Sequence, residues 1–358
     1  MTLLANRYEL LALAGQGGIA TVWRGLMRGA AGFSRPVAVK KLHHELKGDP
    51  TYVAMFVEEA RVGSELHSPN IVQVHDFCLD DHGSYYLIME WVDGISLLDL
   101  LRVQRSRGEP LPWPLACAIG VGALRGLTAA HERLDGAGEP APVIHRDVSP
   151  HNILLGVNGI AKLTDFGLAR ARDRLHAMTT APGTIKGKLS YLAPEVTLGK
   201  GASPHSDIYA MGAVLWEALA GEPLFPGGSD LEVVIKVRAG EVPPLAERRD
   251  DLPVELIDAV HRALGRTPEE RFASAHDMAD ALAPLLPRAR WQRSPQADLG
   301  RAVVEARAGL GAVRAADEPP SDLHVLSDSA LLEVPEGDPD NPILLTRVVL
   351  TSHEDPAS

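Results

Sequence analysis

One eight-residue stretch, His145–Asn152 (HRDVSPHN), constrains this chain more than any other. Apolar runs flank it, Val143–Ile144 before and Ile153–Leu155 after, and Asp165-Phe166-Gly167 follows ten residues beyond Leu155. The stretch places an acid, Asp147, and an amide, Asn152, five positions apart. The second acid, Asp165, lies in a turn that contains Gly167. One carboxylate can orient or receive a hydroxyl proton, while the amide and the second acid hold hard cations against phosphate. The pattern therefore predicts phosphate chemistry at a hydroxyl group.

Composition narrows the class of protein. The chain has 358 residues, enough for a two-lobed domain with an extension, and 45% of them are hydrophobic. Its 47 acids against 35 Lys and Arg give a net charge of -12. A nucleic-acid binder needs a basic face for phosphate contacts, so we expect no nucleic-acid partner.

Cysteine usage and hydropathy predict a cytoplasmic protein. Cys78 and Cys117 form neither a metal-ligand pattern nor a disulfide framework, so we expect both to be small buried side chains in a reducing compartment. The first ten residues lack the apolar region of a signal peptide. With no run of about 18 apolar residues, we also expect no membrane span.

A second phosphate-binding pattern lies near the N-terminus. We expect a strand over Tyr8–Ala14, then the glycine-rich turn Gly15–Val22 and a second strand continuing through Trp23. Glycines let backbone N–H groups approach phosphate oxygens closely. Downstream, the apolar strand Pro36–Val39 ends in Lys40, a cation suited to phosphate, although a solvated lysine at a strand end is the plainer alternative.

In this order and spacing, the motifs resemble those of bacterial eukaryotic-like serine/threonine protein kinases, the Hanks type. The resemblance implies an α+β, two-lobed kinase domain over residues 8–288. Its N-lobe, about 8–91, would hold a small antiparallel sheet with one helix, and its larger C-lobe, about 94–288, would be mainly helical. ATP and Mg²⁺ would bind between the lobes. The third glycine of the family's loop is Ala20 here, a mild departure that still leaves room above a nucleotide.

The resemblance also assigns roles to single residues. Asp147 would take the acceptor hydroxyl's proton, Lys40 would hold the α- and β-phosphates, and Asn152 and Asp165 would hold Mg²⁺. The hinge, Glu90–Val92, would read the adenine edge, with Met89 behind it. The implied nucleotide-binding residues are Ala14, Gly15, Gln16, Gly17, Gly18, Ile19, Ala20, Thr21, Val22, Ala38, Lys40, Met89, Glu90, Val92, Asn152, Leu154 and Asp165, of which Val22 and Ala38 would cover the base from above and Leu154 from below.

Other segments follow the same pattern. Asp49-Pro50 should start a helix with Phe56, Val57, Ala60 and Leu66 on its apolar stripe. On this helix Glu59 would pair with Lys40, with Glu58 as the competing choice. We expect strands over Ile71–Phe77 and Tyr85–Glu90 and helices over Ser96–Arg107 and Trp113–Leu134. The resemblance further implies that Asp207 braces the catalytic loop, and that Arg271 pairs with Glu195 of the Ala193-Pro194-Glu195 motif.

The segment from Leu168 to Ala193 is too long for an idle connection. It contains Thr179, Thr180 and Thr184 as candidate phosphosites. The chain also departs from the family at two positions. The family usually has Lys where this chain has Ser149, and Thr where this chain has Lys188. Those two family positions touch, so Lys188 and Ser149 are candidate catalytic residues that have exchanged an ammonium and a hydroxyl. The alternative is that Lys188 faces solvent and Ser149 caps a turn.

The C-terminal extension, residues 289–358, lies outside the resemblance. Leu299, Val303, Ala306, Leu310 and Val313 share one helical face and predict a short helix. From Asp317 onward, ten acids accompany one Arg, which predicts a largely disordered acidic tail. Within it, the apolar run Ile343–Leu350 either packs back on the domain or docks a partner, and the sequence does not decide between these.

The function indicated is ATP-dependent phosphorylation of protein Ser and Thr hydroxyls, with protein substrates as partners and regulation by activation-segment phosphorylation. The segment 148–151 lacks the Ala-Ala-Arg sequence typical of tyrosine kinases. Two alternatives belong to other classes: an inactive scaffold that binds nucleotide or partner alone, and a small-molecule kinase of the aminoglycoside type. The complete set of phosphate and metal residues argues against the first, and the Ala-Pro-Glu motif with its long preceding segment argues against the second.

Overall fold

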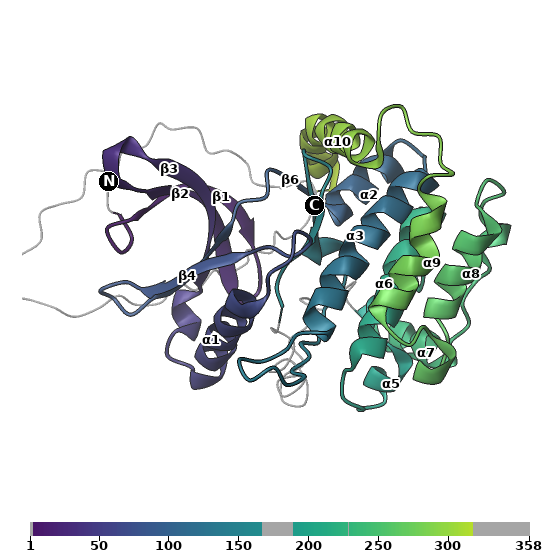
Figure 1. The fold of residues 1–358 in the computed structure, drawn as a ribbon, viewed down its shortest axis with the longest axis horizontal. Coiled ribbons are helices and arrows are strands. Elements are labelled where there is room, and N and C mark those ends of the chain that lie inside the picture. The colour runs from purple at the N-terminus through teal and green to yellow at the C-terminus, as the bar shows by residue number, and fades with distance from the viewer. Residues whose placement is uncertain (1–2, 167–188, 228, 318–358) are drawn as a thin grey trace, which may run out of the picture. The chain divides into compact units, whose positions relative to one another are not determined.

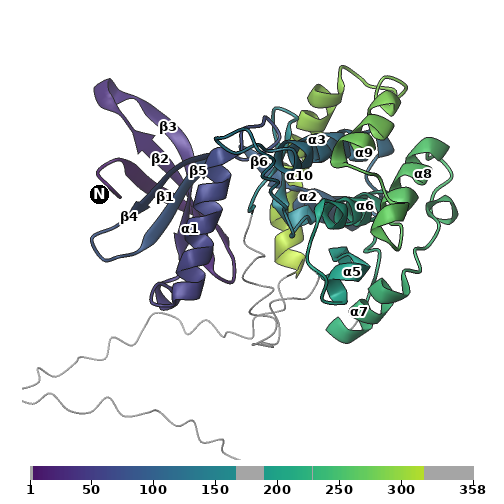
Figure 2. The ribbon, with the colours of Figure 1, turned by 60° about the horizontal axis from the view of Figure 1, so that its bottom comes forward.

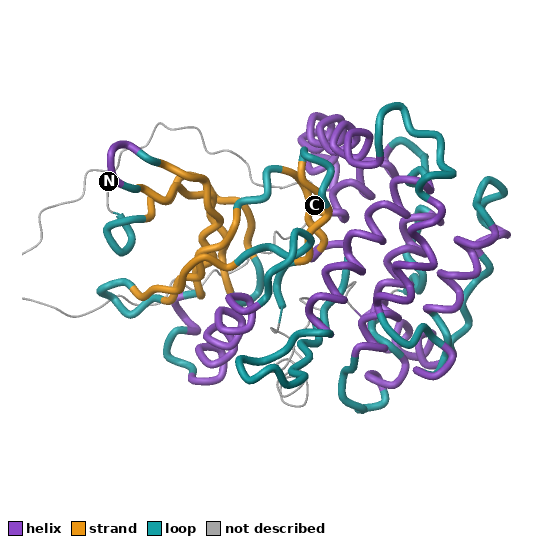
Figure 3. The backbone as a smooth tube through the Cα atoms, in the orientation of Figure 1, coloured by secondary structure: helices purple, strands orange, loops and turns teal. Residues whose placement is uncertain are grey.

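The computed structural model describes residues 3–166, 189–227 and 229–317, with backbone alone for 312–317. Strands dominate its N-terminal part and helices its C-terminal part, as Figures 1 and 3 show. This is the predicted α+β, two-lobed architecture.

The N-lobe is an antiparallel sheet with one helix. Five strands pair in the order β1-β2-β3-β5-β4, and α1 packs against β4 and β5 (Figure 2). The hydroxyl of Tyr8 on β1 donates to Asp76 Oδ2 on β4 at 2.6 Å, so a side-chain bond links the two edge strands. The elements are β1 (Tyr8–Gln16), β2 (Ala20–Arg28), β3 (Ser34–Leu42), α1 (Pro50–Glu65), β4 (Val74–Leu79) and β5 (Tyr85–Glu90).

Two sequence predictions for this lobe need correction. The strand expected over Ile71–Phe77 begins at Val74, because Ile71 instead forms a parallel bridge to Leu163 of the C-lobe. The helix begins as expected, with Asp49 Oδ1 accepting from Thr51 N at 2.8 Å. Val57, however, is 41% exposed and lies off the buried face, where Met55 and Val62 stand instead. Apolar side chains alone did not define that face.

The C-lobe combines a small sheet with a set of helices. Its three strands pair in the order β6-β7-β8. The strands are β6 (Gly94–Ser96), β7 (Ile153–Gly156) and β8 (Ala161–Leu163). The helices are α2 (Leu97–Ser106), α3 (Trp113–His131), α5 (Pro194–Thr197), α6 (Pro204–Ala220), α7 (Asp230–Ala239), α8 (Val254–Ala263), α9 (Ala275–Leu282) and α10 (Pro295–Asp317), and the 3-10 turn η3 (Pro150–Asn152) precedes β7.

Helix α3 forms the centre of this lobe. Twelve of its 19 residues are buried, and it packs against α6, α9 and β8. Small residues permit the close contact: a Cβ on Gly126 would lie 2.7 Å from the carbonyl oxygen of Asn70. Within the described parts of the chain, α3 is the one helix long and apolar enough to cross a membrane, and in this fold its apolar surface belongs to the core.

The two cysteines are free. Cys117 on α3 is fully buried as expected, whereas Cys78 on β4 is only partly buried. The described residues include no cluster of three or more His, Cys, Asp or Glu side chains that could hold a metal ion.

Helix α10 belongs to the same compact unit, which runs to Asp317. It is 23 residues long and packs against α2, α3, β6 and β7. Leu299, Val303, Ala306 and Leu310 are buried on the face that the sequence indicated, and each Leu or Val buried in this way stabilises the fold by about 1.5–3 kcal/mol. Val313 and the tail beyond Asp317 lie outside the residues whose side chains are described.

A buried ion pair joins two segments of the C-lobe that are far apart in sequence. The guanidinium of Arg271 donates from both terminal nitrogens to the carboxylate of Glu195, each at 2.7 Å, and also to the carbonyl oxygen of His205 at 2.9 Å. Its guanidinium also lies 4.9 Å from the ring centre of Tyr209. The pair implied by the resemblance is present, and it fixes the start of α5 against the loop after α8.

We predict that Arg271→Met lowers the free energy of unfolding by about 3–5 kcal/mol, because it leaves the Glu195 carboxylate buried without its cation. Chemical denaturation followed by circular dichroism measures the loss. Arg288→Met is the matched control, since it removes an exposed ion pair with Glu255 and should leave the unfolding midpoint near that of the wild type. Equal midpoints for the two variants would contradict the prediction.

Candidate active site

The ammonium group of Lys40 joins three elements of the fold. Lys40 lies on β3 and is almost fully buried. Its Nζ donates to Glu59 Oε1 on α1 and to Asp165 Oδ1 after β8, each at 2.7 Å. The two lobes therefore meet at one cation held between two carboxylates.

Electrostatics keep this cation charged. Burial pulls the pKa of the Lys40 ammonium down, but Asp165 and Glu59 outweigh burial and raise the pKa above its usual value. Burial also raises the pKa of the Glu59 carboxyl, against the opposing pull of Lys40. The positive charge of Lys40 thus stabilises the ionised Glu59 carboxylate at this buried position.

The structure also decides between the two adjacent glutamates. Glu59 faces Lys40, whereas Glu58 pairs with Arg61 on the exposed side of α1 at 2.7 Å. Neighbouring helix positions point about 100° apart, so only one of the two can face β3.

The catalytic loop, residues 145–152, is held from below by Asp207 at the start of α6. Its Oδ2 accepts from His145 N and its Oδ1 from Arg146 N, both at 2.8 Å. His131, at the end of α3, lies 2.8 Å from the same Oδ2 through its Nε2. The brace expected at Asp207 is present, and His131 is a third contact that sequence reasoning missed because nothing in the pattern linked it to the loop.

His145 sets the inner wall of the loop. Burial lowers the pKa of its imidazole, which keeps the ring neutral. Its Nε2 lies 3.0 Å from the Thr164 carbonyl oxygen, and its Nδ1 accepts from Asp147 N at 3.3 Å. A neutral ring that donates through Nε2 and accepts through Nδ1 satisfies both contacts, so His145 links Asp147 to the backbone just before Asp165.

Asn152 fixes the orientation of Asp147. Its Nδ2 donates to the carbonyl oxygen of Asp147 at 2.8 Å and to Oδ2 of the same residue at 3.0 Å. Because the amide nitrogen is used in this way, Oδ1 is the atom that Asn152 can offer to a cation. The predicted acid and the predicted metal ligand are therefore coupled by direct hydrogen bonds.

Two non-glycine residues of the site have left-handed backbones. Arg146 has a φ of +67° and Asp165 a φ of +63°. Such conformations cost about 1–2 kcal/mol each for an L-residue with a Cβ. Asp207 holds the first through the N–H of Arg146, and Lys40 holds the second through the carboxylate of Asp165. These contacts hold the strained backbone at Asp165 and at Arg146, the residue before Asp147.

Part of the predicted nucleotide-binding set lies in one apolar cluster or packs against it. Ala38 and Met89 are buried there, with Val22 and Leu154 partly buried against the same cluster. Leu154 belongs to β7 of the C-lobe, so the cluster spans both lobes. The glycine-rich turn lies between β1 and β2, where Gly17 N donates to the Ala20 carbonyl oxygen at 2.9 Å. Of the other residues in that list, Ala14, Gly15 and Gln16 end β1, Gly17, Gly18 and Ile19 form the turn, and Ala20 and Thr21 begin β2.

An interlobe ion pair holds the start of the hinge. Lys162 on β8 donates from Nζ to Glu90 Oε2 at the end of β5 at 3.0 Å, and both side chains are largely sheltered. The N–H of Glu90 donates to the Gln73 carbonyl oxygen at 2.8 Å. The sequence placed Glu90 in the hinge but gave no signal for Lys162, which lies 72 positions away.

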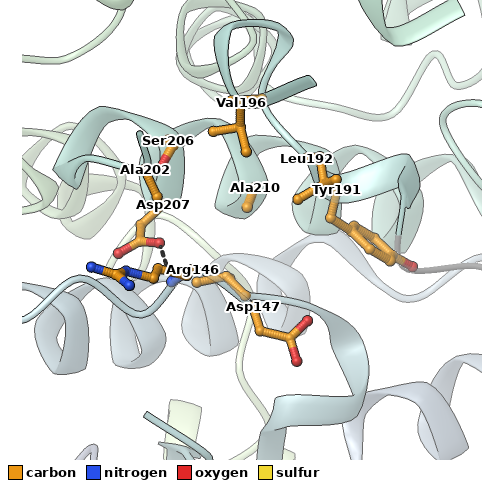
Figure 4. A pocket seen from close by; sticks show the side chains of 11 residues that line it. Arg146, Asp147, Tyr191, Leu192, Val196, Ala202, Ser206, Asp207 and Ala210 are labelled. Atoms are coloured by element: carbon orange, nitrogen blue, oxygen red, sulfur yellow. Dashed lines mark hydrogen bonds between the residues drawn. The ribbon is translucent and has the colours of Figure 1, made fainter. Parts of the chain in front are cut away.

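A pocket opens beside Asp147 (Figure 4). The catalytic loop contributes Arg146 and Asp147, the segment before α5 contributes Tyr191 and Leu192, and α6 contributes Ala210. Figure 4 shows the Asp147 carboxylate turned away from Asp207, which binds the backbone of Arg146. The carboxylate of Asp147 therefore lies beside this pocket and not against Asp207.

The comparison with known families agrees with this geometry. The model described as the protein kinase domain matches residues 8–282. The chain belongs to the protein kinase family.

Curated kinases give matches over most of the chain. The tyrosine-protein kinase MasK of Myxococcus xanthus is 38% identical over 279 residues, which cover 78% of this chain and 43% of MasK. The serine/threonine-protein kinase PknA of Mycobacterium tuberculosis is 36% identical over 284 residues, 78% of this chain and 61% of PknA. A probable serine/threonine-protein kinase of Clostridium perfringens is 32% identical over 277 residues, 77% of this chain and 38% of that kinase. The match thus spans only about two to three fifths of these relatives.

Some predicted residues of the kinase site fall in residues 167–188, outside the described parts: Gly167, Thr179, Thr180, Thr184 and Lys188. Ser149 is described and is only 1% exposed. It precedes η3 but makes no capping bond, and its Oγ has no hydrogen-bond partner among the described residues. The alternative in which Ser149 caps a turn therefore lacks the bond that defines a cap.

We predict that Asp207→Asn destabilises the kinase fold by about 2–4 kcal/mol, because an amide has one acceptor oxygen for the donors that a carboxylate now binds. Denaturation measures the loss, and faster hydrogen exchange at the amides of residues 145 and 146 locates it. Asp258→Asn, at an exposed position on α8, is the control. Unchanged exchange at residues 145 and 146 would show that Asp207 does not hold the loop.

Proposed function

We propose that this protein transfers the γ-phosphoryl group of ATP to Ser or Thr hydroxyls of protein substrates. One observation carries the proposal: the residue before Asp165 bonds to Asn152, since Thr164 N donates to the Asn152 carbonyl oxygen at 3.0 Å. The junction of Lys40 with Glu59 and Asp165 is thereby joined to the coupled pair Asp147 and Asn152. The first set suits phosphates and a cation, and the second suits a hydroxyl proton.

The described residues fit ATP and Mg²⁺. Asn152 Oδ1 and the Asp165 carboxylate are hard oxygen donors, and Mg²⁺ in such sites takes one or two protein ligands and completes its shell with phosphates and water. When bound, Mg²⁺ would neutralise phosphate charge. Lys40 would hold the α- and β-phosphates, the turn at Gly17 would cover them with backbone N–H groups, and the hinge would bind the adenine edge.

Asp147 would orient the acceptor hydroxyl and receive its proton. Its carboxylate is fixed by Asn152 and faces away from the Asp207 brace, beside the pocket in Figure 4. A protein chain lying in that pocket would bring a hydroxyl to the acid. Ala193 lines this pocket, and Arg271 anchors the Ala193-Pro194-Glu195 motif through Glu195. The motif favours a protein acceptor over a small metabolite.

The proposal also states that Ser and Thr side chains, and not Tyr, accept the phosphoryl group. The relatives are named as both kinds of kinase. The segment 148–151, VSPH, lacks the Ala-Ala-Arg sequence typical of tyrosine kinases. Incubation with radiolabelled ATP and a peptide array, followed by phosphoamino-acid analysis, tests it: label on Tyr alone would overturn the choice, and label on small metabolites alone would favour the aminoglycoside-type alternative.

We also propose that phosphorylation of the activation segment regulates activity. Arg146 precedes the catalytic Asp, and in kinases with that pair a phosphate on the segment can order it by pairing with the Arg. Thr180 and Thr184 are the preferred acceptors, ahead of Thr179.

Asp147→Asn should abolish phosphotransfer and leave ATP binding nearly intact, since the acid faces the acceptor and not the nucleotide. A radiolabel-transfer assay and a nucleotide-binding titration separate the two effects. Asp81→Asn, in the exposed turn before β5, is the control for a lost carboxylate. Turnover within about tenfold of the wild type would refute the role of Asp147. If the wild type binds ATP but transfers nothing, the scaffold alternative holds.

Ser149 and Lys188 form a second catalytic hypothesis. Ser149 is two residues from Asp147, and its buried hydroxyl has no partner in the described parts of the chain. We propose that Lys188 supplies the charge that neutralises the transferring phosphoryl group, and that Ser149 supplies the hydroxyl.

Lys188→Ala should then lower turnover by about 10²–10³-fold with little change in ATP affinity, as the loss of one preorganised donor does. Ser149→Lys alone should also lower turnover, because two ammonium groups would crowd one site. Ser149→Lys combined with Lys188→Thr should recover activity. The measurement is a double-mutant cycle in turnover, and strict additivity of the two single losses would show that the residues do not share a site.

A further inference from the structure

Helix α10 lies beyond residues 8–282, the part that matches the kinase family, yet it reaches the strands next to the nucleotide site. It packs against β6, which follows the hinge, and against β7, which follows Asn152 and carries Leu154. Figure 1 shows α10 close to β6 and α2. Helix α10, which follows the residues that match the family, therefore packs against the C-lobe strands next to that site.

The contact reaches the residue directly after the hinge. The side chain of Arg307 on α10 forms an ion pair with Asp93. The carbonyl oxygen of Asp93 accepts from Val157 N at 2.8 Å, and Gly94 pairs with Gly156 in the β6–β7 ladder. Asp93 is thus held by its side chain to α10 and by its backbone to the turn after β7.

The packing of α10 on that turn leaves no space. A Cβ added at Gly300 would lie 2.4 Å from the carbonyl oxygen of Val157. A Cβ added at Gly159, whose φ is +74°, would lie 1.8 Å from the carbonyl oxygen of Gln296. Backbone therefore meets backbone at both places, and a shift of α10 must displace the residues that hold Asp93.

We propose that α10 is a positioning element for the hinge, and that Arg307 is the positioning residue that transmits the position of α10 to Asp93. The inference rests on the proposed function, because it assigns the effect to ATP binding. Since Arg307 touches neither the phosphates nor the acceptor, its contribution belongs to nucleotide affinity and not to the transfer step.

A pair of glycine substitutions on the same helix tests the packing. Gly300→Ala forces α10 away from Val157 and should raise the KM for ATP on the order of tenfold, since small displacements of binding groups have large effects. Gly311→Ala adds the same methyl group where nothing lies within 4 Å, and should leave the KM unchanged. Both substitutions favour helix equally, so the difference between them reports position. Equal KM values would overturn the proposal.

A pair of arginine substitutions tests the ion pair in a protein whose packing is intact. Arg307→Ala should raise the KM for ATP by about twofold to fivefold, the range that one exposed ion pair can supply, with kcat at saturating ATP unchanged. Arg301→Ala removes ion pairs within α10, to Glu305 and Asp298, and is the control. Arg307→Lys should restore part of the affinity. A fall in kcat with constant KM, or a lower melting temperature with constant KM, would make α10 a structural helix only.

A double-mutant cycle with Asp93→Asn completes the test. If Arg307 acts through Asp93, the double variant should have the KM of the more affected single variant, whereas strict additivity would overturn the assignment. The wild type separates this proposal from the proposed function. A wild type that neither binds nor uses ATP refutes the function itself, while an active wild type with unchanged variants refutes the role of α10 alone.

Discussion

The rest of this structure depends on the cation of Lys40. A buried ammonium or carboxylate alone costs several kcal/mol of desolvation, so neither Lys40 nor Glu59 could stay at its position without the other. The third partner, Asp165, brings the C-lobe into the same contact. The ion pairs therefore fix α1 against β3, and they fix the segment after β8 against both elements. The contacts that join the two lobes thus preorganise the proposed phosphate site.

Asp207 plays the corresponding part in the C-lobe. Its buried carboxylate accepts hydrogen bonds from the backbone N–H groups of His145 and Arg146 and lies against His131. These bonds hold Arg146 in a left-handed conformation that an isolated chain would avoid. The strain is small beside the energy of three contacts to a buried carboxylate. Stability supplied by α3 and α6 thus maintains the backbone geometry that turns Asp147 outward.

The sequence predicted the fold, and it named residues that the structure brings together around Lys40 and Asp147, because these residues belong to motifs of fixed residue type and spacing. It could not predict Lys162 or His131, whose partners lie 72 and 76 positions away and whose roles depend on tertiary packing. It misplaced Val57 because an apolar residue at a helix surface looks the same in sequence as one in the core. It began β4 too early because Ile71 pairs across the lobes, and a strand pattern carries no record of its partner.

The ion pairs between the lobes differ in how far they are exposed to water, and this exposure decides which pair separates most easily when the lobes move. Lys40 with Asp165 and Lys162 with Glu90 are largely sheltered, whereas the pair of Arg133 with Glu65 involves a carboxylate that is 40% exposed. Water can replace an exposed partner at little cost, but a sheltered ion must keep its partner or lose solvation. Relative motion of the lobes therefore separates Glu65 from Arg133 more easily than it separates the pairs at the hinge and at Lys40. The backbone also joins the lobes at the end of β8, where Val72 N donates to the Leu163 carbonyl oxygen and Leu163 N donates to the Asn70 carbonyl oxygen, each at 2.8 Å. Separation of Glu65 from Arg133 therefore leaves the strand that ends two residues before Asp165 bonded to the segment before β4.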